Sequence, residues 1–327
     1  MRRSLGFTLG LLVACFLVAC SASPSTLPLP TLAPSPPTSP SPSPSPSATP
    51  SPSATPSPSA TPSATLTETS QPTATATSTL TSPLPSTTQA PLVPSPSPLP
   101  AQFSFGKSTR GIDLTAYRFG TGQQIILLVG GIHAGFEANT VRLVQELITH
   151  FSANPQDIQS HITLILVPVL NPDGLAEGNR LRGRFNGNGV DLNRNWGCGW
   201  SAEAEFSGGQ VNPGAYAFSE VETQALGALV ELTRPAAVLF YHAAARGVFA
   251  GNCQRNISGE LAQVYGTAVG YPFDQAFSAY QVTGTAPAWL DSIGIPAADV
   301  ELASTDATEL TRHLRGVLAL QTWLKAP

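Results

Sequence analysis

Two histidines and a glutamate lie where the chain is predicted to leave buried strands. His133 and Glu137 stand in the stretch GGIHAGFEANT, directly after the apolar run QIILLV, and His242 ends a second apolar run, AAVLFYH. Two imidazoles and one carboxylate are an established ligand set for a catalytic zinc ion, which keeps a fourth position open for water. A histidine at the end of a strand more often caps or packs there, so the remaining sequence must decide between a metal site and a turn.

The elements that must position these residues alternate between apolar runs and amphipathic segments. The predicted strands are residues 123–131, 162–170, 235–242 and 296–304, and the predicted helices are residues 139–151, 219–233, 261–270 and 308–324. This alternation predicts an α/β layered domain with a substantially parallel sheet. In such sheets, active-site residues gather at the carboxyl ends of the strands, where the two histidines are predicted to lie.

Several single residues carry smaller predictions. Ser219 is followed three residues later by Glu222, a pattern that predicts a capping box at the start of a helix. His150 is predicted to end a helix, where a cation is favoured by the helix dipole. His161 precedes a strand, and His313 is expected on a charged helix face.

The first hundred residues have a different character. Residues 1–20 have two arginines directly after Met1 and continue with a short apolar run, the layout of a secretory signal peptide. The run ends in LVAC and resembles the bacterial lipoprotein lipobox, which implies lipidation of Cys20. Residues 21–100 are almost entirely Ser, Pro, Thr, Ala and Leu, with Glu68 as their single charged side chain. This composition predicts a disordered tether between a membrane anchor and a domain over residues 101–327.

Charge and cysteine content narrow the class of protein. Loss of Arg2 and Arg3 with the leader takes the formal net charge from −4 to −6, because 14 basic residues then face 20 acidic ones. An acidic balance of this kind does not suggest a nucleic-acid partner. Cys198 and Cys253 are the two cysteines outside the leader, and an oxidising compartment favours a disulfide between them. The alternative is a pair of buried thiols.

The decisive stretch is NPDGLAEGNRLRGRFNGNGVDLNRNW, residues 171–196. With FSEVETQAL further on, it resembles the M14 family of zinc carboxypeptidases, the carboxypeptidase A/B and E-like enzymes, in order and spacing. The resemblance covers essentially all of residues 101–327, and DLNRN is its most specific part. It implies a three-layer α/β domain with a central mixed, largely parallel sheet, helices on both faces, and one Zn²⁺ per chain.

The same resemblance assigns the metal ligands. It implies that His133, Glu137 and His242 hold the zinc ion and that Asp191 orients His133, since a metal-binding imidazole usually donates its other N–H to a partner. The family motif is His-x-x-Glu, whereas the spacing here is one residue longer. We expect the turn to absorb the additional residue, with Gly135 supplying backbone freedom.

The resemblance also assigns residues to the substrate. Asn193 and Arg194 match the pair that holds the terminal carboxylate, for which a planar guanidinium is suited. Arg184 matches the arginine that stabilises the developing oxyanion. Arg182, two residues earlier, is the alternative for that role.

The C-terminal part supplies the last two functional residues. Tyr280 parallels the family's substrate-capping tyrosine, and Glu301 parallels its catalytic acid and base. The alternative for Glu301 is an edge-strand acid facing solvent beside Asp299. The position that selects the substrate side chain falls at Pro287, which is uncharged and favours an apolar or small terminal residue.

These assignments predict a zinc metallocarboxypeptidase on peptides with a free C-terminal carboxylate. The tether makes a peptidoglycan stem peptide a second candidate substrate. The alternatives from other classes are an inactive surface lipoprotein that binds peptide or metal, and a small-molecule deacylase. We expect a monomer, lipid-anchored at the extracellular face of a bacterial membrane.

Overall fold

The computed structural model describes residues 101–273, 277 and 279–325. The predictions for the leader, the tether and Cys20 lie outside these residues. Within the described part of the chain, no helix combines the length and apolar character needed to cross a membrane.

The domain consists of alternating strands and helices, joined by three short 3-10 turns. The strands are β1 (Gln102–Lys107), β2 (Asp113–Gly120), β3 (Gln124–Val129), β4 (Ile162–Val167), β5 (Ala204–Phe206), β6 (Gly209–Val211), β7 (Ala237–Ala243), β8 (Gly247–Ala250) and β9 (Ala297–Leu302). The α-helices are α1 (Ala138–Ala153), α2 (Pro172–Glu177), α3 (Val221–Thr233), α4 (Gly259–Val269), α5 (Ala286–Ser292) and α6 (Leu310–Trp323).

Seven strands form one mixed sheet in the order β1-β2-β4-β3-β7-β9-β8. The four central strands, β4, β3, β7 and β9, run parallel to one another, and the outer strands β1, β2 and β8 add antiparallel pairings. Strands β5 and β6 form a separate hairpin. Because the central strands are parallel, their carboxyl ends meet at one edge of the sheet, which is where β3 and β7 deliver the two candidate ligands.

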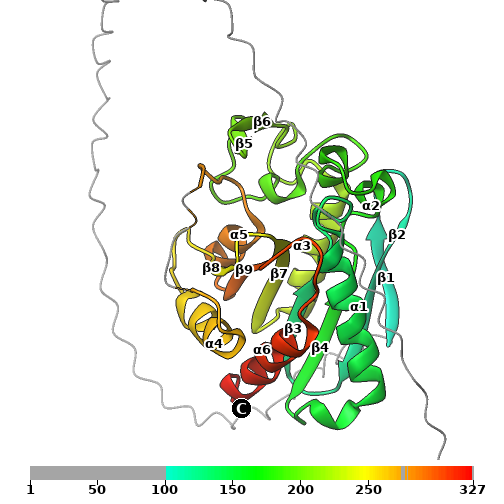
Figure 1. Ribbon diagram of the computed structural model, residues 1–327, viewed down its shortest axis with the longest axis vertical. Coiled ribbons are helices and arrows are strands. Elements are labelled where there is room, and N and C mark those ends of the chain that lie inside the picture. The colour runs from blue at the N-terminus through cyan, green and yellow to red at the C-terminus, as the bar shows by residue number, and fades with distance from the viewer. Residues whose placement is uncertain (1–100, 274–276, 278, 326–327) are drawn as a thin grey trace, which may run out of the picture. The chain divides into compact units, whose positions relative to one another are not determined.

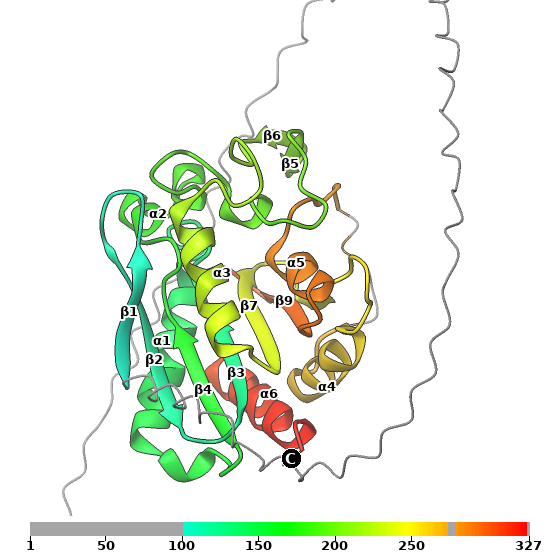
Figure 2. The same ribbon diagram turned by 180° about the vertical axis from the view of Figure 1, so that it is seen from behind.

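Helices cover both faces of the sheet, which confirms the predicted three-layer α/β fold. Helices α1, α4 and α6 pack on one face (Figure 1), and α3 and α5 pack on the other (Figure 2). The central strands are apolar on both sides, so β3 sends Ile126 and Leu128 into the first core and Leu127 and Val129 into the second. In the sequence, strands that are buried on both faces are continuous apolar runs.

The predicted capping box is wrong. Helix α3 starts at Val221 after Glu220, and no side chain caps it. The Ser219 hydroxyl donates instead to Glu220 Oε1 over 2.7 Å. The Glu222 carboxylate accepts from the backbone N–H of Thr109 over 2.7 Å, so a contact from a distant segment replaces the local cap.

The placement of His313 on a charged helix face is also wrong. His313 is fully buried on α6, on the side that packs against α4 and the sheet. Its Nδ1 lies 3.0 Å from the Tyr265 hydroxyl, and that hydroxyl also lies 3.0 Å from Tyr241 Oη. Of its charged neighbours in the sequence, Arg315 is exposed, whereas Arg312 is half-buried over the Tyr271 ring, 5.2 Å from the ring centroid.

Candidate active site

Three buried side chains from separate segments converge at the carboxyl ends of β3 and β7. His133 lies in the turn after β3, Glu137 directly precedes α1, and His242 is in β7. His133 Nδ1 lies 3.1 Å from Glu137 Oε1, and His242 Nδ1 lies 3.2 Å from Glu137 Oε2. Each residue offers a ligand atom within 4.8 Å of the others. Both imidazoles therefore present Nδ1 to one point.

The lengthened spacing is accommodated by one compact turn. The backbone N–H of Glu137 donates to the carbonyl of His133 over 2.8 Å, so the two side chains lie on the same side, as residues i and i+4 do in a helix. Gly135 keeps an ordinary backbone conformation. A Cβ at Gly135 would lie 2.2 Å from the carbonyl oxygen of Gly174, so glycine is needed there for space rather than for unusual backbone angles.

The electrostatics of this cluster suit a divalent cation. Burial raises the pKa of Glu137, but His133 and His242 outweigh it and hold that pKa well below its ordinary range. The carboxylate is therefore ionised at neutral pH. Two imidazoles, which must be neutral to bind a metal, and one carboxylate, with an open side toward a cavity, are the donor set of catalytic zinc sites, so these residues fit one zinc ion.

Asp191 lies behind the cluster and is fully buried. Its Oδ1 is 3.0 Å from His133 Nε2 and accepts the backbone N–H of Asn193 over 3.0 Å, while Oδ2 accepts Arg184 Nε–H over 2.7 Å. Burial raises its pKa, but Arg184 and His133 outweigh it and hold the pKa well below the usual value. An ionised Asp191 therefore fixes both the imidazole and the guanidinium.

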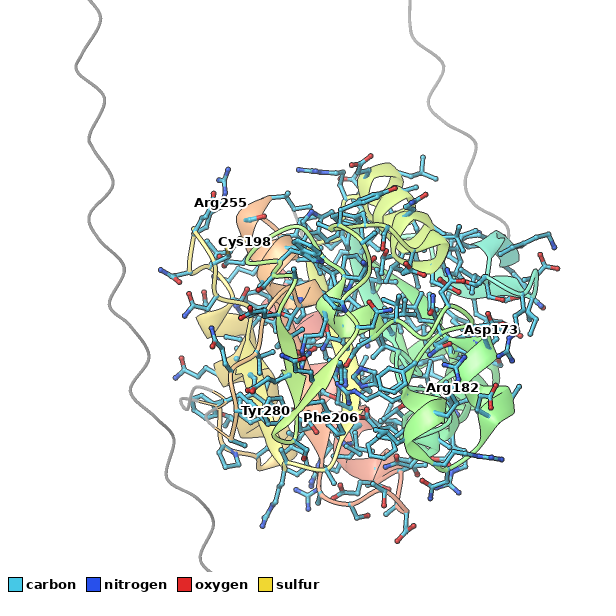
Figure 3. The ribbon with its side chains drawn as sticks, turned by 90° about the horizontal axis from the view of Figure 1, so that it is seen from above. Asp173, Arg182, Cys198, Phe206, Arg255 and Tyr280 are labelled. Carbon is cyan, nitrogen blue, oxygen red and sulfur yellow. A yellow bond between two sulfur atoms is a disulfide. The ribbon has the colours of Figure 1, made fainter. Side chains whose placement is uncertain are left out.

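The structure separates the two arginines that sequence reasoning had left as alternatives. Arg184 is buried, lines the cavity and places Nη1 3.5 Å from Glu137 Oε1. Arg182 instead donates from Nη1 to the carbonyl of Asn186 over 2.9 Å, and it lies with Asp173 away from Tyr280 (Figure 3). Of the two arginines, Arg184 is thus the one that faces the cavity.

Asn193 and Arg194 also line the cavity. Asn193 Oδ1 accepts the backbone N–H of Ala286 over 3.0 Å, which orients its amide. The Arg194 guanidinium is buried and held by the carbonyl of Glu205, which accepts from Nε over 3.1 Å and from Nη2 over 2.9 Å. The two side chains are therefore fixed before any ligand arrives.

Aromatic rings form a wall of the cavity. Tyr280 and Phe206 lie side by side, with ring centroids 5.9 Å apart (Figure 3). Phe206, from the β5–β6 hairpin, also stacks against the Arg184 guanidinium, whose Cζ is 3.7 Å from the ring centroid. Sequence reasoning did not identify Phe206. The β5–β6 hairpin contains no family motif, so only the three-dimensional contact with Arg184 and Tyr280 identifies Phe206 as a cavity residue.

Glu301 is on β9, directly opposite His242 in the parallel register. Strand β9 lies between β7 and β8, so the alternative of an edge-strand acid facing solvent does not hold. Glu301 Oε2 accepts the backbone N–H of Ala245 over 3.2 Å. Burial raises the pKa of Glu301 to about 7, with Glu137 acting in the same direction. A carboxyl group with a pKa near neutrality is suited to exchange protons with a substrate.

The cavity in front of these residues has a volume of about 850 Å³. The predicted disulfide is present: Cys198 and Cys253 are bonded, with Cα atoms 6.4 Å apart, and both line the cavity. Asp291 holds the loop that carries Cys253, because its carboxylate accepts backbone N–H groups from each of residues 253–257. Pro287 lines the same cavity.

The fold and the His-Glu-His site define a metallocarboxypeptidase-like α/β domain. The profile of the zinc carboxypeptidase family, peptidase family M14, matches residues 97–298, and the chain belongs to this family. Its mixed seven-stranded sheet and its cluster of metal-ligating residues are those that the family resemblance implied.

Individual proteins resemble parts of the chain. Zinc carboxypeptidase A 1 from Anopheles gambiae is 30% identical over 142 residues, which cover 39% of this chain and 32% of that protein. Inactive metallocarboxypeptidase ECM14 from Uncinocarpus reesii is 35% identical over 122 residues, which cover 30% of this chain and 21% of that protein. The chain thus spans about a third or less of the length of these relatives.

A solved structure supports the fold. Murein-tripeptide amidase MpaA from Escherichia coli O157 superposes with a TM-score of 0.51 at 22% sequence identity, covering 70% of this chain and 94% of that chain. At this identity the likeness concerns the fold alone.

Proposed function

We propose that this protein is a zinc-dependent carboxypeptidase that removes the C-terminal residue of peptides. The observation that carries the proposal is the convergence of every required group on one cavity. The metal-ligating triad, the carboxyl group of Glu301 and the basic pair of Arg184 and Arg194 all line it.

The residues at the far side of the cavity would bind the end of the substrate. Asn193 and Arg194 donate to the terminal carboxylate, and they are held in place by Ala286 and Glu205 before binding. Fixed donors lose little entropy on binding, so the scissile bond is brought reproducibly to the triad. Tyr280, beside Phe206, closes over the bound residue.

The catalytic step depends on Glu301 and Arg184. When bound to the triad, zinc lowers the pKa of water and polarises the peptide carbonyl. Glu301 accepts a proton from the attacking water and delivers it to the leaving amine. Arg184, oriented by Asp191, donates to the oxyanion that develops on the carbonyl.

The substrate is either a protein-derived peptide or a cell-wall peptide. Pro287, Ala288 and Ala250 line the cavity and favour an apolar or small terminal residue. The fold likeness to a murein-tripeptide amidase supports the cell-wall peptide, as does the predicted tether of residues 21–100. An inactive binding protein is the competing function, since one relative is named inactive. The presence of Glu301 and all three ligands favours activity.

We further propose that the protein is anchored by a lipid on Cys20 at the outer face of a bacterial membrane. The support is the leader sequence ending in LVAC. Mass spectrometry of the N-terminal peptide tests this proposal, because a lipid-modified Cys20 has a defined mass increment, and Cys20→Ala would release the protein from membranes.

Matched peptides test the proposed activity. The purified zinc-loaded protein is incubated with a pool of peptides, each present with a free C-terminal carboxylate and as its C-terminal amide. We expect loss of single residues from the free peptides only, abolished by a chelator and restored by zinc. Cleavage of the amides at the same rate would contradict carboxylate recognition. A second pool of cell-wall stem peptides identifies the alternative substrate.

A further inference from the structure

Each imidazole of the metal-ligating triad has a carboxylate on the nitrogen that faces away from the ligand position. For His133, this carboxylate is Asp191. On the other side, Asp299 Oδ1 lies 3.2 Å from His242 Nε2. We propose that Asp299 is a positioning residue for His242, which holds the imidazole tautomer with its proton on Nε2 and leaves Nδ1 free for zinc. The inference rests on the proposed zinc site but not on peptide hydrolysis.

The surroundings of His242 Nε2 leave this carboxylate as its acceptor. Asn193 Nδ2 is 3.3 Å from the same nitrogen. The Asn193 amide cannot turn its oxygen there, because Oδ1 already accepts the backbone N–H of Ala286. Asn193 Nδ2 is therefore a donor, and without Asp299 it would favour the tautomer with an unprotonated Nε2. That tautomer carries its proton on Nδ1 and cannot ligate a metal there.

The carboxylate of Asp299 resolves this conflict because it can accept from both groups. Its Oδ1 faces His242, and its Oδ2 accepts from Asn193 Nδ2 over 3.4 Å. Among the described residues, the buried Oδ1 has no hydrogen-bond partner in place, and the His242 imidazole lies 3.2 Å from it through Nε2. A buried carboxylate oxygen without a donor is costly. The tautomer that binds metal supplies that donor.

The strand geometry explains why Asp299 is in place to do this. Asp299 pairs with Phe240 in the register of β9 and β7, two residues before the pairing of Glu301 with His242. Alternate residues of a strand share a face, so Asp299 and Glu301 both point toward the cavity. Asp299 thereby links the metal site to the amide that would bind the substrate carboxylate.

Zinc affinity tests the proposal directly. The dissociation constant for zinc is measured by chelator competition for the wild type, Asp299→Asn, Asp299→Ala and the exposed control Asp113→Asn. We expect the alanine variant to bind zinc about 10- to 100-fold more weakly. The asparagine variant should lose less, because its amide oxygen still accepts from Nε2. The control should match the wild type, and the metal-free proteins should melt at the same temperature.

A second measurement needs no variant. In zinc-loaded wild-type protein with ¹⁵N-labelled histidine, NMR should show a protonated Nε2 on His242 that exchanges slowly with solvent. An unprotonated Nε2, or unchanged zinc affinity in both Asp299 variants, would overturn the proposal.

Peptide binding separates positioning from substrate recognition. Binding of matched peptides ending in lysine or norleucine is compared in the Glu301→Gln background with and without Asp299→Asn. If the second substitution weakens only lysine binding while zinc affinity stays unchanged, Asp299 recognises a cationic side chain and the positioning role is wrong. If zinc affinity falls as expected but the wild type cleaves no peptide, the positioning role stands and the proposed function fails.

Discussion

Protonation of His313 should destabilise the folded domain, because its imidazole lies in a core with no acceptor for a second proton. The Tyr265 hydroxyl is the hydrogen-bond partner of Nδ1, and Nε2 has no hydrogen-bond partner within the described residues. Burial lowers the pKa of His313 to about 4; Arg312 acts in the same direction and Glu309 opposes it. The neutral imidazole is therefore the form that the fold accepts.

The magnitude and sign follow from the two pKa values. An unfolded histidine has a pKa of about 6.5, so between pH 6.5 and 4 the unfolded state binds the additional proton and folding loses stability as the pH falls. The contribution of neutral His313 to the unfolding free energy is therefore complete above about pH 6.5. A difference of roughly 2.5 pH units corresponds to about 3 kcal/mol at 1.36 kcal/mol per unit.

The comparison is between the wild type and His313→Gln, whose side chain does not titrate. Urea unfolding is followed at several values between pH 7 and pH 4. Between pH 7 and pH 4, the unfolding free energy of the wild type should fall by about 3 kcal/mol more than that of His313→Gln. A difference that stays constant, or a His313 NMR signal that titrates near pH 6.5 in the folded protein, would refute the reasoning.

Three further predictions concern the site. Arg184→Ala should lower kcat by about 10²- to 10³-fold, because an oxyanion donor is lost. Arg182→Ala should leave kcat nearly unchanged. Equal losses of kcat in the two variants, measured by steady-state kinetics, would contradict the assignment of Arg184 as the oxyanion donor. Replacing Cys198 and Cys253 with serine opens a loop of 55 residues, so unfolding free energy in urea should fall by roughly 2–4 kcal/mol and KM should rise. An unchanged KM would show that the bridge does not shape the cavity. Gly135→Ala should weaken zinc binding in a chelator assay, because its Cβ would press on a backbone carbonyl; wild-type zinc affinity would disprove the close contact.

Much of the fold could be predicted because its central strands are buried on both faces. Continuous apolar runs such as residues 124–129 and 162–167 are visible in a single sequence. In the helices between such runs, apolar residues recur at helical spacing. The outer strands were not predicted. Strand β1 is partly exposed along its length and β8 has only four residues, so their sequence patterns resemble those of loops.

The candidate site was predicted largely from motifs. His133 and His242 follow from strand ends, and the family resemblance supplied the residues that the structure brings to the same cavity. Neither spacing nor composition could have revealed Asp299, because its contact with His242 depends on the register between β9 and β7. Register is set by the whole sheet rather than by either strand alone.

The two wrong local predictions have the same physical cause. Ser219 and Glu222 form a capping pattern in the sequence, but tertiary contacts take the Glu222 carboxylate elsewhere. His313 has charged neighbours along the chain, but its own position on the helix faces the core. In both cases packing outweighs a weak local preference.

The central claim is that Glu301 moves the proton in a zinc-dependent hydrolysis. The most direct test is kcat/KM for release of the C-terminal residue by the wild type and Glu301→Gln, with zinc content measured for both. The account predicts full zinc occupancy in each protein and a loss of about 10²- to 10⁴-fold in the variant. Equal kcat/KM values at equal zinc content would contradict it.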